Sequence, residues 1–299
     1  MKFIKGQLHI HTSVSDGDAD PKTVAQEFRD MGYDFVAFTD HTAPYDASVY
    51  SDNNLTVLSG TEWAAVVNNP NYRDIVKLHV NAVGYYKEDN GILDAYAKQY
   101  NDFFGYPNVH NTKNVRENQP YCEASVSQTL NNMLAEVYRQ GGIPTVNHPN
   151  WFNFDFHNPK APETVYENGI LTEKKGQNFA PFDYRELLGV DYPYILEVKN
   201  VSLPDFSAGY KSLESSEYIW DVLLTKGKNV LACFSDDSHN YKREIRNKIH
   251  DFQIPGQTSV MVNAENNENN IKEALKKGKF YASNGIELDY YEVMDNKIR

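Results

Sequence analysis

Two features that the sequence lacks exclude whole classes of protein. Cysteine is scarce: Cys122 and Cys233 stand far apart and in no metal-ligand or redox spacing, so a disulfide scaffold is not expected. Long apolar runs are missing, and none approaches the roughly 18 residues of a membrane span. Residues 1–12 carry charges and lack the apolar stretch of a signal peptide. The chain is therefore predicted to be soluble and cytoplasmic, with no membrane partner.

An excess of basic residues is also missing. Lys and Arg total 29 against 41 Asp and Glu, which gives a net charge of −12 with the histidines neutral. Binding along nucleic acid needs a basic surface, so no extended nucleic-acid surface is expected. An anionic substrate is not excluded, because bound divalent cations can reverse the charge of a site locally.

What the sequence does contain is a regular alternation of apolar strands and amphipathic helices. Strands are predicted at residues 2–12, 33–41, 55–63, 75–86, 143–150, 194–201 and 229–239. Helices are predicted at residues 18–32, 129–142, 215–227 and 269–278. The first helix has Asp20 as its N-cap and Pro21 at its first position. Nearly continuous apolar strands separated by helices indicate a parallel α/β architecture.

Polar side chains gather at one end of these predicted strands, where a parallel α/β barrel builds its active site. His9 and His11 share a face because strand side chains alternate, and so do Asp237 and His239, which leaves Asp236 pointing away. His, Asp and Glu suit Zn, Mn or Fe as ligands. Taken alone, His9 and His11 fit better a pair of ordinary histidines on a half-exposed strand.

Six motifs follow one another over residues 7–239: "LHIHTSVSDG", "FTDHT", "GTEW", "KLHV", "NHP" and "FSDDSH". Together they resemble the successive motifs of the polymerase and histidinol phosphatase (PHP) superfamily of metallohydrolases. The resemblance implies an α/β fold, a distorted (βα)7 TIM-like barrel of the PHP type with its active site at the C-terminal strand ends. It also implies two to three divalent ions, which we expect to be Zn, Mn or Fe.

The resemblance further implies which side chains hold each ion. His9, His11, Glu62 and Asp237 would hold the first. Glu62 would bridge to a second, held also by His79 and His148, and Asp16, His41 and His239 would hold a third. Asp16 stands where some members carry a histidine. Read without the resemblance, Asp16 also fits an ordinary turn residue and His79 a buried core histidine.

The C-terminal segment carries a second, narrower resemblance. The helix of residues 269–278 followed by "KFYASNG" resembles the carbaryl-hydrolase branch of the superfamily, and residues 286–293 alternate like a strand. We therefore expect a barrel at residues 1–265, with residues 150–192 as an insertion or lid. Residues 266–299 are expected to form a C-terminal helix and strand packed on that barrel.

The function expected from these motifs is a metal-dependent phosphoesterase in which a metal-bridging hydroxide attacks a phosphate mono- or diester. Its substrate would be a small phosphorylated molecule or a nucleotide. Asp40 would orient a ligand, Asn200 matches an Asn often found near the metals, and Arg243 would clamp a phosphate. Two alternatives remain: hydrolysis of a carboxylic or carbamic ester on the same cluster, and a non-catalytic metal-binding module. The other histidines, His110, His157 and His250, match no motif.

Overall fold

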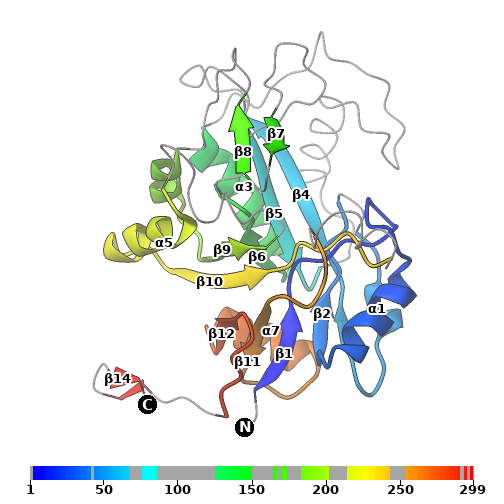
Figure 1. Cartoon of the computed structure of the whole chain (residues 1–299). Coiled ribbons are helices and arrows are strands. Elements are labelled where there is room, and N and C mark those ends of the chain that lie inside the picture. The colour runs from blue at the N-terminus through cyan, green and yellow to red at the C-terminus, as the bar shows by residue number, and fades with distance from the viewer. Residues whose placement is uncertain are drawn as a thin grey trace.

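A computed structural model describes residues 3–41, 44–67, 76–85, 125–149, 164–167, 170–173, 183–201, 214–242, 253–289, 293–294 and 297–298. These residues form a mixed α/β fold with two five-stranded sheets (Figure 1). The predicted α/β class is confirmed.

The first sheet has the order β12-β11-β1-β2-β3. Its parallel part consists of β1 (Ile4–Gln7), β2 (Phe35–Ala37) and β3 (Thr56–Leu58). On the other side of β1, β11 (Ser259–Val262) and β12 (Phe280–Ser283) run antiparallel. This sheet therefore pairs β1, near the N-terminus, with β11, a strand from late in the chain (Figure 1).

The second sheet has the order β10-β9-β6-β5-β4 and departs from the parallel arrangement that the sequence predicts. β10 (Val230–Ser235), β9 (Tyr194–Asn200) and β6 (Ile143–Val146) are parallel. β5 (Val76–Val83) runs antiparallel to both β6 and β4 (Gly60–Val67). The reason is chain length: only residues 68–75 connect β4 to β5, and a parallel crossover needs about a dozen residues or more.

Two isolated parallel bridges join the sheets, one between Ile10 and Ser238 and one between His41 and Glu62. The run predicted as one strand at residues 55–63 is split at Ser59, so that β3 enters the first sheet and β4 the second. A closed (βα)7 barrel does not follow from these two open sheets. It stays a prediction.

Capped helices pack against the sheets at the positions that the sequence predicts. α1 (Pro21–Asp30) begins after Asp20, whose carboxylate accepts the N–H groups of Lys22 and Thr23 as an N-cap. The others are α3 (Val126–Arg139), α5 (Ser216–Thr225) and α7 (Glu268–Lys276). Short elements are η1 (Ala47–Tyr50), η2 (Tyr184–Gly189), β7 (Thr164–Glu167), β8 (Ile170–Glu173), β13 (Val293–Met294) and β14 (Lys297–Ile298).

The predicted insertion at residues 150–192 falls largely outside the described residues. Its described parts are the β7–β8 hairpin and η2, and its role as a lid stays a prediction. Where the structure describes helices, none has both the length and the apolarity needed to cross a membrane.

The C-terminal segment differs from the expectation in one respect. The strand that follows α7 is β12, which lies upstream of the predicted strand at residues 286–293. β12 forms there because it pairs with β11. Ile286 and Leu288 are instead exposed, at 66% and 41%. The apolar face of α7 is buried as predicted, with Ile271 and Leu275 in the core beside Leu8. The domain boundary at residue 265 is not tested by this packing and stays a prediction.

Candidate metal centre

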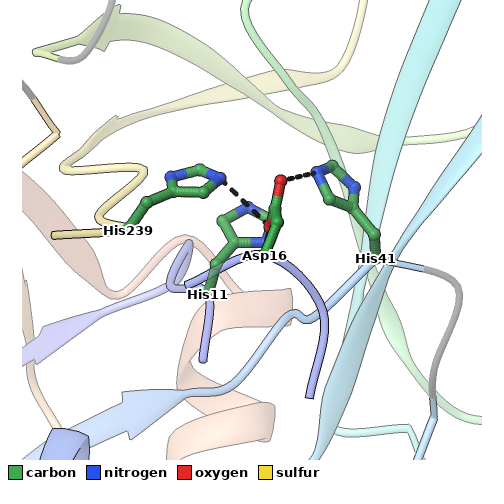
Figure 2. Close-up of side chains that lie close together, drawn as sticks. All are labelled: His11, Asp16, His41 and His239. Carbon is green, nitrogen blue, oxygen red and sulfur yellow. Dashed lines mark ion pairs between the residues drawn. The ribbon is translucent and has the colours of Figure 1, made fainter. Parts of the chain in front are cut away.

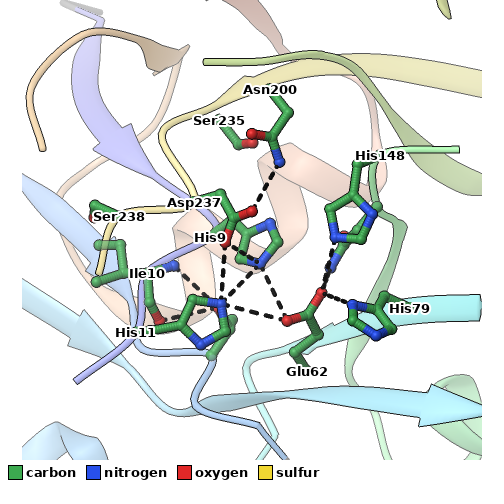
Figure 3. Close-up of polar contacts among 12 residues, drawn as sticks. His9, Ile10, His11, Glu62, His79, His148, Asn200, Ser235, Asp237 and Ser238 are labelled. Carbon is green, nitrogen blue, oxygen red and sulfur yellow. Dashed lines mark hydrogen bonds and ion pairs between the residues drawn. The ribbon is translucent and has the colours of Figure 1, made fainter. Parts of the chain in front are cut away.

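All nine side chains predicted to bind metal converge in one cluster that is buried at its centre and exposed at one edge. Figure 3 shows the buried part and Figure 2 the exposed edge. They come from the ends of β1, β2, β6 and β10, from inside β4 and β5, and from the turn after β1. The cluster contains His9, His11, Asp16, His41, Glu62, His79, His148, Asp237 and His239.

Glu62 lies at the middle of this cluster, and its two oxygens face different imidazoles (Figure 3). Oε1 lies 3.0 Å from His79 Nδ1 and 3.4 Å from His148 Nε2. Oε2 lies 3.4 Å from His9 Nε2, 3.3 Å from His11 Nε2 and 3.1 Å from His41 Nδ1. A carboxylate placed in this way can bridge two ions.

On the Oε2 side of Glu62, His9 and His11 share one face, as the alternation of the strand predicts. Their Nε2 atoms are 3.1 Å apart, and each lies 3.2 Å from Asp237 Oδ1. No more than one proton can lie between two nitrogens at this distance, so at least one lone pair points inward. His9, His11 and Asp237 therefore place ligand atoms from three side chains within 4.8 Å of one another.

The remaining group lies at the rim of the cluster. Asp16 stands between His41 and His239, with its oxygens 3.5 Å and 3.4 Å from their Nε2 atoms (Figure 2). His11 Nδ1 is 3.6 Å from the same carboxylate, and the His11 ring stacks on that of His239 at 4.1 Å. His11 thus contacts two of the three groups.

Hydrogen bonds to Asp40 fix the turn that carries Asp16. The Asp40 carboxylate accepts the N–H of Thr12 at 2.7 Å, the Thr12 hydroxyl at 2.8 Å and the Ser15 hydroxyl at 2.8 Å. Gly17 closes the turn, because a Cβ there would lie 2.7 Å from the His11 carbonyl oxygen. Asp40 therefore positions the turn, while its predicted catalytic role stays untested.

Two of the ligand candidates have backbone conformations that side chains rarely adopt. His148 has φ of 24° and Asp237 has φ of 47°. Such conformations cost about 1–3 kcal/mol each and are found mainly where function requires them. The fold thus holds both side chains in place at some expense of stability.

The charges of the cluster keep its carboxylates ionised. Burial raises the pKa of Glu62, but its interactions with the surrounding imidazoles, those of His79 and His9 first, outweigh burial and hold that pKa well below its ordinary value. The pKa of Asp237 is likewise well below its ordinary value, because the charge of His9 overcomes burial. Burial lowers the pKa of His79 to about 4, so this imidazole is neutral at pH 7. Burial opposes the protonated form of His9, yet the charges of Asp237 and Glu62 raise its pKa well above the ordinary value.

The residues fit divalent ions in their chemistry. Every donor is an imidazole nitrogen or a carboxylate oxygen, the set that suits Zn, Mn and Fe. The side chains form three groups, and within each group the ligand atoms lie within 4.8 Å of one another. His11 Nδ1 is buried and has no hydrogen-bond partner within the described part of the chain, which an ion or a water on it would satisfy.

Sequence reasoning missed two side chains of the site. Glu197 on β9 accepts a hydrogen bond from His9 Nδ1 at 2.8 Å, and Asn147 donates to Glu62 Oε1 at 2.7 Å. Both are buried. The signal for Glu197 was an acid inside the otherwise apolar run "YILEV", and Asn147 directly precedes a predicted ligand.

The other predicted residues fall in different places. Asn200 Nδ2 donates to Asp237 Oδ2 at 3.1 Å, which places it beside the cluster. Asp236 points away, as predicted, and accepts the N–H groups of Gly256 and Thr258. Arg243 and the histidines His110, His157 and His250 lie outside the described residues, so their predicted roles stay predictions.

Comparisons with known proteins give distant likenesses only. No protein-family model matches the sequence, and no curated protein matches it. One similar structure is a two-domain protein from Bacteroides vulgatus containing a predicted PHP-like metal-dependent phosphoesterase, with 18% identity and a TM-score of 0.44. It is matched over 94% of this chain, which spans 64% of that protein's length.

Two further structures are similar at the same level. One is a Bifidobacterium adolescentis protein to which metal-dependent phosphoesterase activity is ascribed, with 18% identity, a TM-score of 0.44, and coverage of 78% of this chain and 87% of that one. The other is a Chromobacterium violaceum amidohydrolase with bound sulfate, with 14% identity, a TM-score of 0.43, and coverage of 79% and 87%. These likenesses are too distant to assign a function, and the carbaryl-hydrolase resemblance stays a prediction.

Proposed function

We propose that this protein is a metal-dependent phosphoesterase acting on a small phosphorylated molecule or a nucleotide. The observation that carries the proposal is the position of Glu62, whose two oxygens face two different sets of imidazoles. A bridging carboxylate between histidine sites is what a centre of two or three ions requires. We expect Zn, Mn or Fe, because the donors are nitrogen and oxygen only.

Each group of side chains has its own task in this proposal. His9, His11 and Asp237 would hold one ion, His79 and His148 a second across Glu62, and the rim group of Asp16, His41 and His239 a third. Divalent ions in such a centre lower the pKa of a water toward about 7 and neutralise charge on a phosphoryl group. The chain itself supplies no Ser-His-Asp arrangement among its described residues.

Exposure indicates from which side a substrate would reach the cluster. The Asp16 side chain is 54% exposed and that of His41 29%, whereas Glu62 is only 1% exposed. A phosphate would therefore arrive over the rim, where the third group lies. Arg243, the proposed phosphate clamp, follows Tyr241 and Lys242, whose backbone N–H groups donate to Asp18 on the turn after β1.

The test is hydrolysis by protein stripped with chelator and reloaded with Zn, Mn or Fe. The substrates are p-nitrophenyl phosphate, bis-p-nitrophenyl phosphate and p-nitrophenyl acetate, with metal content measured by plasma mass spectrometry. We expect metal-dependent release of nitrophenol from a phosphate ester. Release from the acetate alone would replace the proposal by the carboxylic or carbamic ester hydrolase. Two to three bound ions without any turnover would favour the non-catalytic module.

A further inference from the structure

The carboxylate of Glu197 contacts two of the ligand groups at once. Its Oε1 accepts from His9 Nδ1 at 2.8 Å and from the Ser235 hydroxyl, and its Oε2 accepts from the backbone N–H of His148 at 2.7 Å. Asn200 Nδ2 donates to the same Oε2 at 2.9 Å. Each oxygen thus has two donors, which leaves no room for an ion on this carboxylate.

The backbone of β9 is shaped to place these groups. Cys233 of β10 pairs with Glu197, and Phe234 pairs with Lys199, so that Val198 is skipped. Such a bulge turns the following side chain to the other face. Asn200 therefore lies on the same side as Glu197 and donates to it. The Asn200 amide also donates to Asp237 Oδ2 at 3.1 Å (Figure 3).

The contact with His9 determines which of its nitrogens is free. A carboxylate with two donors on each oxygen accepts hydrogen bonds, so His9 Nδ1 carries the proton. With an ion bound, the second proton is lost and the lone pair is on Nε2, which faces Glu62 and Asp237. A carboxylate on the far nitrogen of a ligating histidine fixes both the tautomer and the ring orientation.

The contact with His148 fixes a strained backbone. His148 has φ of 24°, and its N–H is held by Glu197 rather than by a strand partner. The same carboxylate therefore orients an imidazole on each side of Glu62.

We propose that Glu197 is a positioning residue that holds His9 in the Nδ1–H form and the His148 backbone in place, so that both ion groups form together. The inference rests on the metal centre of the proposed function and is independent of the substrate.

Glutamine at position 197 has a single carbonyl oxygen. Its amide must face either His9 Nδ1 or the His148 N–H as a donor, so one of the two contacts is lost.

The experiment measures metal affinity of Glu197→Gln by equilibrium dialysis with Zn²⁺ and plasma mass spectrometry. We expect about a tenfold to hundredfold loss of affinity. The matched control is Glu136→Gln, which changes a buried carboxylate on α3 that bonds Arg139 and should leave affinity unchanged. Equal affinity of Glu197→Gln and wild type overturns the inference. Failure of the wild type to bind Zn²⁺, Mn²⁺ and Fe²⁺ alike overturns the proposed function instead.

A second measurement needs no folded variant at position 197. Zn²⁺-loaded wild type with ¹⁵N-labelled histidine reports the protonated nitrogen of each ring by NMR, and His9 is assigned from the signal lost in His9→Gln. We expect His9 to carry its proton on Nδ1 in a hydrogen bond. A proton on Nε2 would overturn the inference even if Glu197→Gln fails to fold.

Discussion

The two sides of the candidate metal centre are held in different ways. Glu62 and His79 lie inside neighbouring antiparallel strands, with 1% and 4% of their surface exposed. Asp16 lies on a turn after β1, with 54% of its side chain exposed. The buried side, with Glu62 and His79, is therefore part of the sheet. The rim at Asp16 is a turn that hydrogen bonds to Asp40 hold in place.

This difference has energetic consequences. Charges buried in a sheet interact strongly, and removing one partner leaves the other uncompensated in a poorly solvated place. Charges at an exposed rim are screened by water and salt. Substitutions on the buried side should therefore affect folding and metal together, and substitutions at the rim should affect metal alone.

The largest effect is expected for Glu62→Gln. In the metal-free protein at pH 7, the change removes the anion that five imidazoles face, so the free energy of unfolding should fall by about 3–5 kcal/mol. Both ion groups that share Glu62 should lose affinity by more than about 100-fold, because a ligand is lost and not only its support. Urea denaturation in chelator and metal analysis after dialysis measure the two effects.

The control for this substitution is again Glu136→Gln, on a helix that packs behind β5. It should lower stability without lowering metal content. Full metal content in Glu62→Gln would show that Glu62 does not bridge, and the contrast between the two sides would lose its main support.

A second test uses pH to separate His79 from the other imidazoles. Its pKa is about 4 in the folded chain against 6.5 ordinarily, so the unfolded chain binds more protons between these values. Stability therefore falls as pH falls from 6.5. His9, His11, His41 and His239 have raised pKa values, so their contributions are already complete below 6.5.

Asp236 acts in the opposite direction, because burial raises its pKa to about 6 and stability from this group grows as pH falls through that value. The comparison must therefore be between wild type and His79→Gln, both free of metal. Between pH 6.5 and 4.5 the difference in unfolding free energy should move by about 2–3 kcal/mol in favour of the variant. A constant difference over this range would mean that His79 titrates normally.

Much of the fold was readable from local signals, and the misses were long-range. The caps and apolar faces of α1 and α7 follow from Asp20, Pro21 and the spacing of Ile271 and Leu275. The direction of β5 was missed, because an apolar run such as residues 75–86 looks the same in a parallel and an antiparallel sheet. The division of residues 55–63 into two strands depends on partners far away in the chain.

The convergence of the predicted side chains was foreseen better than the sheet that carries them. Alternation correctly placed His9 beside His11 and turned Asp236 away, since that rule needs only the strand itself. Glu197 and Asn147 were missed because their roles depend on which strands become neighbours. Ligand assignments came from the resemblance, and the structure brings those side chains together without testing what they bind.

A smaller effect is expected for Asp40→Asn, which changes the hydrogen bonds that hold the turn carrying Asp16. Asp40 is buried, and both of its oxygens accept hydrogen bonds, from Thr12, Ser15 and Tyr45. In asparagine an NH₂ group replaces one of these oxygens, so it would face a donor and that hydrogen bond would be lost. The free energy of unfolding should fall by about 1–3 kcal/mol. Metal analysis should show a loss confined to the rim ion. The control Asp46→Asn keeps the cap on η1 and should change neither quantity.

The smallest effect on folding is expected for Asp16→Asn, which tests the rim itself. The imidazoles of His41 and His239 hold the pKa of Asp16 below its ordinary value, so its carboxylate is ionised at pH 7. Replacing it should weaken one ion by about tenfold to a hundredfold and change the free energy of unfolding by less than about 0.5 kcal/mol. The control is Asp20→Asn, because Asp20 is an exposed N-cap of α1 and asparagine caps a helix equally well. If Asp16→Asn instead released all ions or unfolded the chain, the rim would be part of the same structural unit as Glu62. The separation of a structural side from an exchangeable side would then be wrong.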